Sequence, residues 1–433
     1  MRIESLTKES RQALLKLLED RNPASYTAQQ AAVDEIIANV RARGDAAVFD
    51  YEKRFDRCSL TKETLRVTRS EIDAAYAELD PEFIGVMKRA AANIREYHEM
   101  QKVNSWITTK PDGSILGQRV TPVASSGCYV PGGRAAYPSS VLMNIIPAKV
   151  AGVPHIICCT PPDAEGRIVA GTLAAADIAG VDEIYKVGGA QAIAAMAYGT
   201  ESIPRVDKIT GPGNIYVALA KKACFGITGI DSVAGPSEIL VIADETANPR
   251  YIAADLLSQA EHDPLASAIL LTTSRHFAEE VSREIDGFLT TLERADIIRQ
   301  SLDNYGYAFV GETMEDLIDA ANAIASEHME IVTANPFEVM TKIRNAGAIF
   351  LGSYSSEPLG DYYAGPNHIL PTNGTARFFG PLGVDQFVKR TSIISYSREA
   401  LEAVHGDIEL FAKNEGLTAH ANSIAVRFED DHE

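Results

Sequence analysis

The sequence lacks several patterns that assign a chain to a protein class directly. Its five cysteines are scattered and form no CxxC pair, which excludes a cysteine zinc ribbon and argues against a disulfide scaffold. No stretch matches GxGxxG or GxxxxGK[ST], so neither common nucleotide-binding motif is present. Short internal repeats and low-complexity segments are also missing.

Basic clusters and long apolar runs are missing as well. Lys and Arg number 40 against 59 Asp and Glu, a net charge of −19, which makes nucleic acid a poor partner. The most apolar stretch, residues 141–160, contains Lys149 and two prolines, so we expect no membrane span. The first twenty residues hold no apolar h-region, so we expect no signal peptide and a cytoplasmic protein.

What is present indicates a globular chain with a large core. Its 433 residues suffice for two to four domains. Residues 25–56 and 81–101 carry apolar side chains at helical spacing. From Gly127 onward, short β-rich runs alternate with Ala-rich helical runs, which predicts parallel sheets with helices on both faces and two α/β units. The tail beyond residue 397 is predicted to be helical.

Three glycine-rich segments follow or flank predicted strands: "YVPGG" (129–133), "KVGGAQAI" (186–193) and "GPGN" (211–214). Glycines at such positions let backbone N–H groups approach a phosphate. Any one of them is explained equally well as a turn. Their position at the ends of consecutive strands favours a nucleotide site along that edge of the sheet.

Four pairs of polar residues are candidates for chemistry. Glu327 and His328 adjoin each other where a predicted helix meets a strand. The pair is either a polar turn or two acid–base groups of different pKa. Gln259 and His262 share a helix face, a weak metal pattern that a polar helix end before Pro264 also explains.

The other two pairs lie nearer the end of the chain. Asp361 and His368 occupy a Gly/Pro-rich loop, where an aspartate is commonly a turn former. Glu415 and His420 lie near the C-terminus, where a solvated helix face explains them. Sequence spacing alone cannot bring these pairs together; only the fold or a second subunit can.

Taken together, these stretches resemble the histidinol dehydrogenase family over nearly the whole chain. The motifs that carry the resemblance occur in the family's order: "GCYVPGGRAAYPSSVLMNIIPAKVAGV", "VGGAQAIAAMAYGTESIPRVDKITGPGN", "AGPSEILVIAD", "DLLSQAEHDP", "ASEHMEI" and "GDYYAGPNH". The resemblance implies oxidation of L-histidinol through L-histidinal to L-histidine with two NAD, the last steps of histidine biosynthesis. It also implies one zinc per subunit and a homodimer.

The resemblance assigns roles to particular residues. Glu327 and His328 would be the catalytic acid–base pair, the histidine taking protons in the oxidations and the glutamate activating the water that adds to the aldehyde. The implied NAD-binding residues are Tyr129, Gln191 and Asn214. The implied zinc ligands are Gln259, His262, Asp361 and His420. The implied substrate-binding residues are Ser237, Gln259, His262, His328, Asp361, His368, Glu415 and His420.

The fold that the resemblance implies is α/β, with two incomplete Rossmann-like domains in an aldehyde-dehydrogenase-like architecture and small helical pieces at both ends. The expected parts are an N-terminal helical arm (1–24), a catalytic zinc domain (25–126 and 235–382), an inserted NAD-binding domain (127–234) and a C-terminal helical domain exchanged in the dimer (383–433).

Three other functions stay open from the sequence. A related zinc- and NAD-dependent dehydrogenase could act on another alcohol, such as a sulfonated propanediol. A zinc hydrolase could use Glu327 as its base, but it would leave the three glycine-rich segments without a role. A non-catalytic metal-binding scaffold would tolerate replacement of both Glu327 and His328.

Overall fold

The computed structural model describes residues 1–21, 26–132, 137–233 and 235–429. The chain divides into two compact units. The first comprises Met1–Gln101 and Val123–Phe387, and the second comprises Lys102–Pro122 and Val388–Glu433.

The first unit contains a parallel six-stranded sheet of order β1-β11-β10-β9-β12-β13. Its strands are β1 (Arg2–Ser5), β9 (Glu238–Ala243), β10 (Ser267–Thr272), β11 (Gly306–Val310), β12 (His328–Val332) and β13 (Ala348–Leu351). The three strands β9, β10 and β12 are buried along their whole length, as expected for a parallel sheet covered on both faces. The sequence predicts a helical arm at the N-terminus, but the chain begins with the edge strand β1. The four residues of β1 show no alternation of buried and exposed side chains that would indicate a strand.

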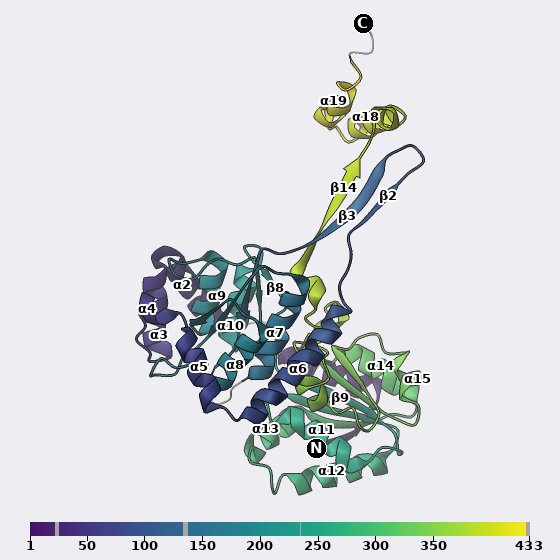
Figure 1. Cartoon of the computed structure of the whole chain (residues 1–433). Helices are drawn as coiled ribbons and strands as arrows, with labels where there is room; N and C mark the ends of the chain where they lie inside the picture. The colour runs from purple at the N-terminus through teal and green to yellow at the C-terminus, as the bar shows by residue number, and fades with distance from the viewer. Residues whose placement is uncertain (22–25, 133–136, 234, 430–433) are drawn as a thin grey trace. The chain divides into compact units, whose positions relative to one another are not determined.

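Alternate residues of β9 face two separate hydrophobic cores, because side chains along a strand point to opposite faces of the sheet. Ile239 and Val241 pack with α11 (Pro249–Ala260), α12 (Arg275–Phe288) and α13 (Ala295–Tyr305). Figure 1 labels these three helices near β9. Leu240 and Ile242 pack with α1 (Lys8–Asp20) and α14 (Met314–Ile324). The short helices of this region are α15 (Pro336–Met340), α16 (Glu357–Tyr362), η1 (Thr375–Arg377) and η2 (Val384–Phe387).

The same unit contains a parallel five-stranded sheet of order β6-β5-β4-β7-β8. Its strands are β4 (Ser125–Tyr129), β5 (His155–Thr160), β6 (Glu183–Lys186), β7 (Lys208–Thr210) and β8 (Gly229–Ile230). The strand order reverses between β4 and β7, the position where doubly wound sheets bind their ligands.

Helices from the N-terminal third of the chain cover this smaller sheet. One core holds α2 (Thr27–Arg43), α3 (Asp45–Phe55), α9 (Gly189–Tyr198) and α10 (Ile215–Cys224). The other holds α5 (Arg69–Glu78), α6 (Pro81–Glu99), α7 (Pro138–Ala151) and α8 (Ala170–Ala179), and α4 (Lys62–Leu65) is a single turn. The α/β class with parallel sheets is therefore confirmed, while the domain boundaries expected from the sequence stay a prediction.

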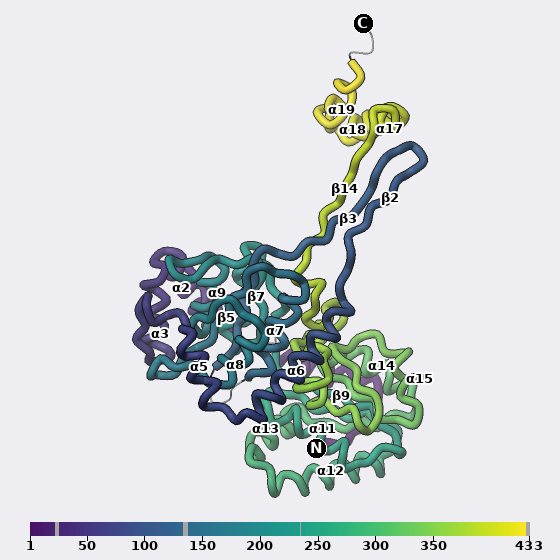
Figure 2. The backbone as a smooth tube through the Cα atoms, viewed as in Figure 1, coloured from purple at the N-terminus to yellow at the C-terminus, as the bar shows by residue number. Residues whose placement is uncertain are grey.

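The second unit is an antiparallel sheet of order β14-β3-β2 followed by three helices. The strands are β2 (Trp106–Thr109), β3 (Ile115–Pro122) and β14 (Val388–Ser395), and β14 runs beside β3 over its full length (Figure 2). The helices are α17 (Arg398–Glu402), α18 (His405–Asn414) and α19 (Thr418–Ala425). The buried hydrophobic residues of this unit are alanines, Ala400, Ala412 and Ala421, while Ile394, Leu410 and Phe411 are exposed. Within its described residues, the unit has almost no core of its own.

Candidate active site

A left-handed residue joins α14 to the strand that carries the Glu327–His328 pair. Thr313 and Asp316 form a capping box at the start of α14, and Ala325 ends the helix with φ of 56°. This conformation costs a non-glycine residue free energy, so the surrounding structure must hold it. The turn brings Glu327 and His328 to the start of β12, where 7% and 4% of their surfaces are exposed.

Glu327 is held by a reciprocal arrangement with Glu238 on the neighbouring strand β9. The Glu238 N–H donates to Glu327 Oε2 at 2.9 Å, and the Glu327 N–H donates to Glu238 Oε2 at 3.3 Å. Arg21 forms a buried ion pair with the other carboxylate oxygen of Glu238. Burial raises the pKa of Glu327 well above its usual value, and the negative charges nearby raise it further.

Hydrogen bonding gives His328 a defined tautomer. Its Nδ1 lies 3.1 Å from the carbonyl oxygen of Glu238, which can only accept, so Nδ1 carries the proton. Nε2 therefore presents a lone pair, and no hydrogen-bond partner reaches it from the described part of the chain. Burial lowers the pKa of His328 to about 3, so the ring is neutral. The neutral ring leaves Nε2 free to accept a proton.

Two carboxyl groups lie opposite this nitrogen. Asp361 Oδ1 is 3.9 Å and Glu357 Oε1 is 4.0 Å from His328 Nε2. Burial raises the pKa of Glu357 to about 8 and that of Asp361 to about 6, and the two carboxyl groups share a hydrogen bond. Ser258 Oγ donates to the other oxygen of Glu357 at 3.1 Å.

His368 is placed by contacts at both ring nitrogens. Nδ1 lies 3.0 Å from the carbonyl oxygen of Asp361, and Nε2 lies 3.2 Å from Ser140 Oγ on α7. Burial lowers the pKa of His368 to about 4. The charge of His262 lowers the pKa of His368 by a smaller amount, and it also lowers the pKa values of His328 and Glu357. The structure thus gathers His262, His328, Glu357, Asp361 and His368 into one region.

The donor set in this region fits a metal ion. Ligand atoms of His328, Glu357 and Asp361 lie within 4.8 Å of one another. Gln259 Oε1 is buried on the neighbouring helix α11 and receives no donor from any described residue. Imidazole nitrogen and carboxylate oxygen are the ligands that zinc takes in enzymes, and an unpaired amide oxygen is a further donor atom available to a cation.

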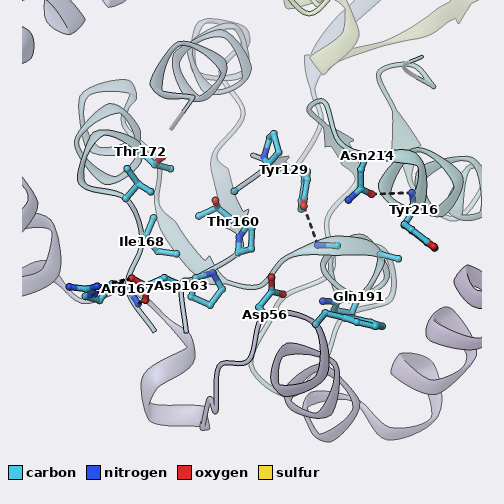
Figure 3. Close-up of a pocket in the computed structure, with 18 of the residues that line it drawn as sticks. Asp56, Tyr129, Thr160, Asp163, Arg167, Ile168, Thr172, Gln191, Asn214 and Tyr216 are labelled. Atoms are coloured by element: carbon cyan, nitrogen blue, oxygen red, sulfur yellow. Dashed lines mark hydrogen bonds and ion pairs between the residues drawn. The ribbon is translucent and has the colours of Figure 1, made fainter. Parts of the chain in front are cut away.

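A second candidate site is a cavity of about 1050 Å³ at the carboxyl ends of the five-stranded sheet (Figure 3). Tyr129, Gln191 and Asn214 all line it, each from a different strand end. The Tyr129 hydroxyl accepts the N–H of Gly189 at 3.0 Å. Asn214 Oδ1 caps α10 by accepting the N–H groups of Tyr216 and Val217. A cavity of this size can hold a dinucleotide.

Comparisons with known proteins decide the family. The family model "Histidinol dehydrogenase" matches residues 19–428. The histidinol dehydrogenase of Halalkalibacterium halodurans is 60% identical over 93% of this chain and 95% of its own length. That of Geobacillus kaustophilus is 59% identical over 93% and 94%. The crystal structure of histidinol dehydrogenase from Elizabethkingia anophelis superposes with a TM-score of 0.94 at 38% identity, covering 100% of this chain and 99% of the other.

The chain belongs to the histidinol dehydrogenase family. It is an oxidoreductase of histidine biosynthesis, and histidinol is the alcohol that its family oxidises with NAD. The shared name of the relatives does not favour the alternative of a sulfonated propanediol. The structural match also supports the expected α/β fold over the full chain.

The remaining predicted site residues lie in two places. Ser237, half-buried, directly precedes β9 and therefore adjoins Glu238. Glu415 at the end of α18 and His420 on α19 belong to the second unit, where both are exposed. Their roles, like those of the other predicted site residues, stay predictions.

Sequence reasoning missed three residues that the structure places in this network: Arg21, Glu238 and Glu357. Arg21 and Glu238 are 217 positions apart and meet only through the fold. Glu357 had a usable signal, since it lies four residues before Asp361 on what proved to be one helix.

Proposed function

We propose that this chain oxidises L-histidinol to L-histidine in two successive oxidations at the Glu327–His328 junction. The observation that carries the proposal is the free Nε2 of a neutral, buried His328, which faces Asp361 and Glu357 near the unpaired Oε1 of Gln259. Bound NAD would accept a hydride in each oxidation. The chain's own contribution is to hold the substrate, to move protons and to control water.

His328 takes the proton from the hydroxyl group of histidinol through Nε2, because Nδ1 is committed to the Glu238 carbonyl. The aldehyde must then add water before a second hydride can leave. Glu327 Oε2 is held by the Glu238 N–H, so Oε1 is the atom that accepts a proton from that water. Once His328 has passed its first proton to solvent, it takes the hydroxyl proton of the hydrate. Two adjacent residues thereby serve both oxidations without release of the reactive aldehyde.

We propose Gln259, His262 and Asp361 of this chain, with His420, as zinc ligands. The buried, unpaired Oε1 of Gln259 supports this set. Bound zinc would orient the imidazole and amine of the substrate and offset the negative charge of Asp361 and Glu357, one of the causes that raise the pKa of Glu327. Ser237, His368 and Glu415 are the further substrate-binding residues in this proposal.

The proposed NAD site is the cavity lined by Tyr129, Gln191 and Asn214. It lies where the strand order reverses, which supports a dinucleotide rather than an unrelated ligand. A zinc hydrolase would explain Glu327 and the metal ligands but would leave this cavity unused.

We also propose that the protein is a cytoplasmic homodimer whose second unit packs against a second copy. Exposed Trp106, Ile107, Ile394, Leu410 and Phe411 give that unit an apolar surface with little internal packing, which supports burial in an assembly. Among the described helices, none combines the length and apolarity needed to cross a membrane. In an isologous dimer, His420 would enter the site of the partner subunit.

The experiment that tests the proposal is a substrate panel read by NADH absorbance. The zinc-loaded protein should form two NADH per histidinol and one per histidinal, and far less with other amino alcohols and diols. Ester or amide hydrolysis without NADH formation would contradict it and favour the hydrolase. Equal activity with a sulfonated propanediol would contradict the assigned substrate.

A further inference from the structure

The turn that follows β6 is already occupied by protein. The Gly188 N–H donates to Glu52 Oε1 at 3.1 Å, and the Gly189 N–H donates to the Tyr129 hydroxyl at 3.0 Å. These are the N–H groups that a glycine-rich turn would otherwise offer to a phosphate. These two N–H groups are therefore not available to a ligand.

Two carboxyl groups lie behind the turn: the buried Glu52 on α3 and the partly exposed Asp56 just after it. Glu52 is completely buried, and its Oε1 also accepts from Gln191 Nε2 at 2.8 Å. Its Oε2 receives no N–H or O–H donor within the described ranges. Asp56, one helical turn later, shares a hydrogen bond with Glu52. Two carboxyl groups can form such a bond only when one of them is protonated.

The proton belongs on Glu52. Burial raises the pKa of Glu52 to about 8, and the charge of Asp56 raises it further. Burial also raises the pKa of Asp56, but the hydrogen bond from Glu52 lowers it. Glu52 is thus a neutral acid that donates, and Asp56 is the carboxylate that accepts.

Asp56 is open to a ligand. Its carboxylate lines the cavity and points into it (Figure 3). None of the described N–H groups donates to this carboxylate, and a methyl group placed on Gly188 would lie 3.3 Å from Oδ2. Gln191 Oε1 is buried nearby and also lacks a donor from the described chain. A ligand at this end must therefore supply hydrogen-bond donors.

Another acid that lines the cavity, Asp163, is fully used by its own turn. Its Oδ1 accepts the N–H groups of Glu165 and Arg167 at 3.0 and 2.8 Å, and its Oδ2 accepts from the Arg167 guanidinium at 3.0 to 3.1 Å. Asp163 follows β5, the second strand of the β4–α7–β5–α8–β6 half. In doubly wound sheets, a carboxylate in that region commonly binds the 2′-hydroxyl of the adenosine ribose.

We propose that Asp56 is the specificity-determining residue that accepts the 2′-hydroxyl of the adenosine ribose and rejects a 2′-phosphate, with Glu52 as its positioning residue. The inference rests on the proposed NAD-dependent oxidation. Asp56 lies against Gly188 and near Pro161, which follow β6 and β5, so it reaches the half of the sheet that takes the adenosine moiety. Of the arginines that line the cavity within the described ranges, Arg167 is paired with Asp163, and Arg54 lies over the ring of Phe55.

Calorimetric titration of the zinc-loaded full chain with NAD, NADP and 2′-deoxy-NAD tests the proposal. Wild-type protein should bind NAD at least tenfold more tightly than NADP. Asp56→Asn should weaken NAD binding about tenfold, since a hydrogen bond to a charged group is lost. It should leave NADP binding unchanged or strengthen it, so that the preference for NAD shrinks at least tenfold. The deoxy analogue should bind wild type and Asp56→Asn equally, because it lacks the group that Asp56 contacts.

Glu52 gives a second readout that a purely structural role would not produce. Glutamine has the same acceptor and donor arrangement as a protonated glutamic acid. Glu52→Gln should therefore keep wild-type affinity and the preference for NAD. Glu52→Leu, of similar size but without polar atoms, should lose both. If Glu52→Gln loses the preference as completely as Glu52→Leu, the protonated-acid arrangement is overturned.

Asp50→Asn is the matched control, because Asp50 lies exposed on α3, the helix that carries Glu52, and forms an ion pair with Arg43. Its ratio of NAD to NADP affinity should equal that of wild type. If Asp56→Asn keeps the preference for NAD, or if Asp163→Asn loses it instead, the assignment of Asp56 is overturned. In either case, NADH formation from histidinol would leave the proposed function standing. Wild-type protein that neither binds NAD nor forms NADH overturns both. A partly unfolded variant lowers the binding stoichiometry but not the affinity ratio, so the ratio stays decisive.

Discussion

The imidazole of His328 lies 3.1 Å, through Nδ1, from the backbone carbonyl of Glu238, a residue 90 positions earlier on the adjacent strand β9. This contact leaves Nε2 as the atom that takes protons. It also provides an isosteric test, because the amide nitrogen of asparagine can occupy the place of Nδ1 while nothing replaces Nε2. His328→Asn should slow both oxidations about 10²- to 10⁴-fold, the usual contribution of a general base.

Single-turnover formation of NADH, first from histidinol and then from histidinal, measures the two steps of His328→Asn separately. Retained zinc content and an unchanged melting temperature would show that the substitution removed only the base. A variant that oxidises histidinal at the wild-type rate would contradict a role for His328 in the second step.

Glu327→Gln should spare the first oxidation. The glutamine oxygen still accepts the N–H of Glu238, so the local structure is kept, but the amide cannot take a proton from water. We expect the first NADH to form within about tenfold of the wild-type rate, and the second to slow by at least about a hundredfold. Equal suppression of the first hydride transfer by Glu327→Gln and His328→Asn would show that the division of labour is wrong.

Removal of zinc should abolish turnover, and its return should restore it. The proposed ligands include His262, which must be neutral to bind, so zinc affinity should fall as the pH drops through the protonation range of histidine. His262→Ala should lower zinc content measured by atomic absorption, whereas His276→Ala, an exposed histidine on α12, should not. Full activity of the metal-free protein would exclude zinc from the reaction.

A buried histidine away from the acidic cluster should shape the acid stability of the fold. His98 is completely buried, its Nδ1 lies 2.7 Å from the Ile94 carbonyl, and burial lowers its pKa. Above pH of about 6.5 the ring is neutral in both states and contributes no pH dependence. Below that value the unfolded chain binds a proton that the folded one excludes, so stability falls by up to about 1.4 kcal/mol per pH unit until the folded pKa is reached.

Urea unfolding of wild type and His98→Met between pH 7.5 and 5 checks this sign. The variant should be less stable at pH 7.5, because Asn367 Nδ2 loses its contact with the ring. Its free energy of unfolding should nevertheless fall less steeply than that of wild type as the pH drops. The difference between the two slopes should correspond to the uptake of about one proton on unfolding. Parallel curves for the two proteins would mean that His98 is not the group responsible.

Much of the architecture could be predicted from local patterns. Continuous apolar runs such as Glu238–Ala243 indicate parallel strands, and the glycine-rich segments lie at strand ends, which is why Tyr129, Gln191 and Asn214 meet on one cavity. The strand Arg2–Ser5 was missed because it is an edge strand paired with residues about 300 positions away, and its own sequence carries no periodicity.

The support of the site could not be predicted, because it consists of contacts between distant segments. Arg21, Glu238 and Glu327 form one network only because β9 and β12 are neighbours and the N-terminal segment reaches Glu238. The same holds for Glu52, which reaches Gly188 from 136 positions away. A single sequence shows residue types and local periodicity, but it does not show which distant strands and side chains become neighbours in the fold.

The proposed shared site makes the sharpest prediction about assembly. His420 lies on α19 of the second unit, whose described residues have little core, and in the proposed dimer it completes the site of the partner subunit. Two inactive variants, His328→Ala and His420→Ala, should then complement each other when their subunits exchange. In a mixed dimer, one site collects both defects and the other collects none.

Random exchange should restore about a quarter of wild-type activity, because half of the dimers are mixed and half of their sites are intact. NADH formation after exchange, with the mixed dimer verified by native mass spectrometry, is the measurement. Exchange between His328→Ala and His368→Ala is the matched control, because both residues lie in the first unit. That pair should recover nothing, since every site keeps one defect. The shared site would be ruled out if the control pair recovered activity, or if the His420 pair recovered no activity after verified exchange. Either result would leave the dehydrogenase assignment unaffected.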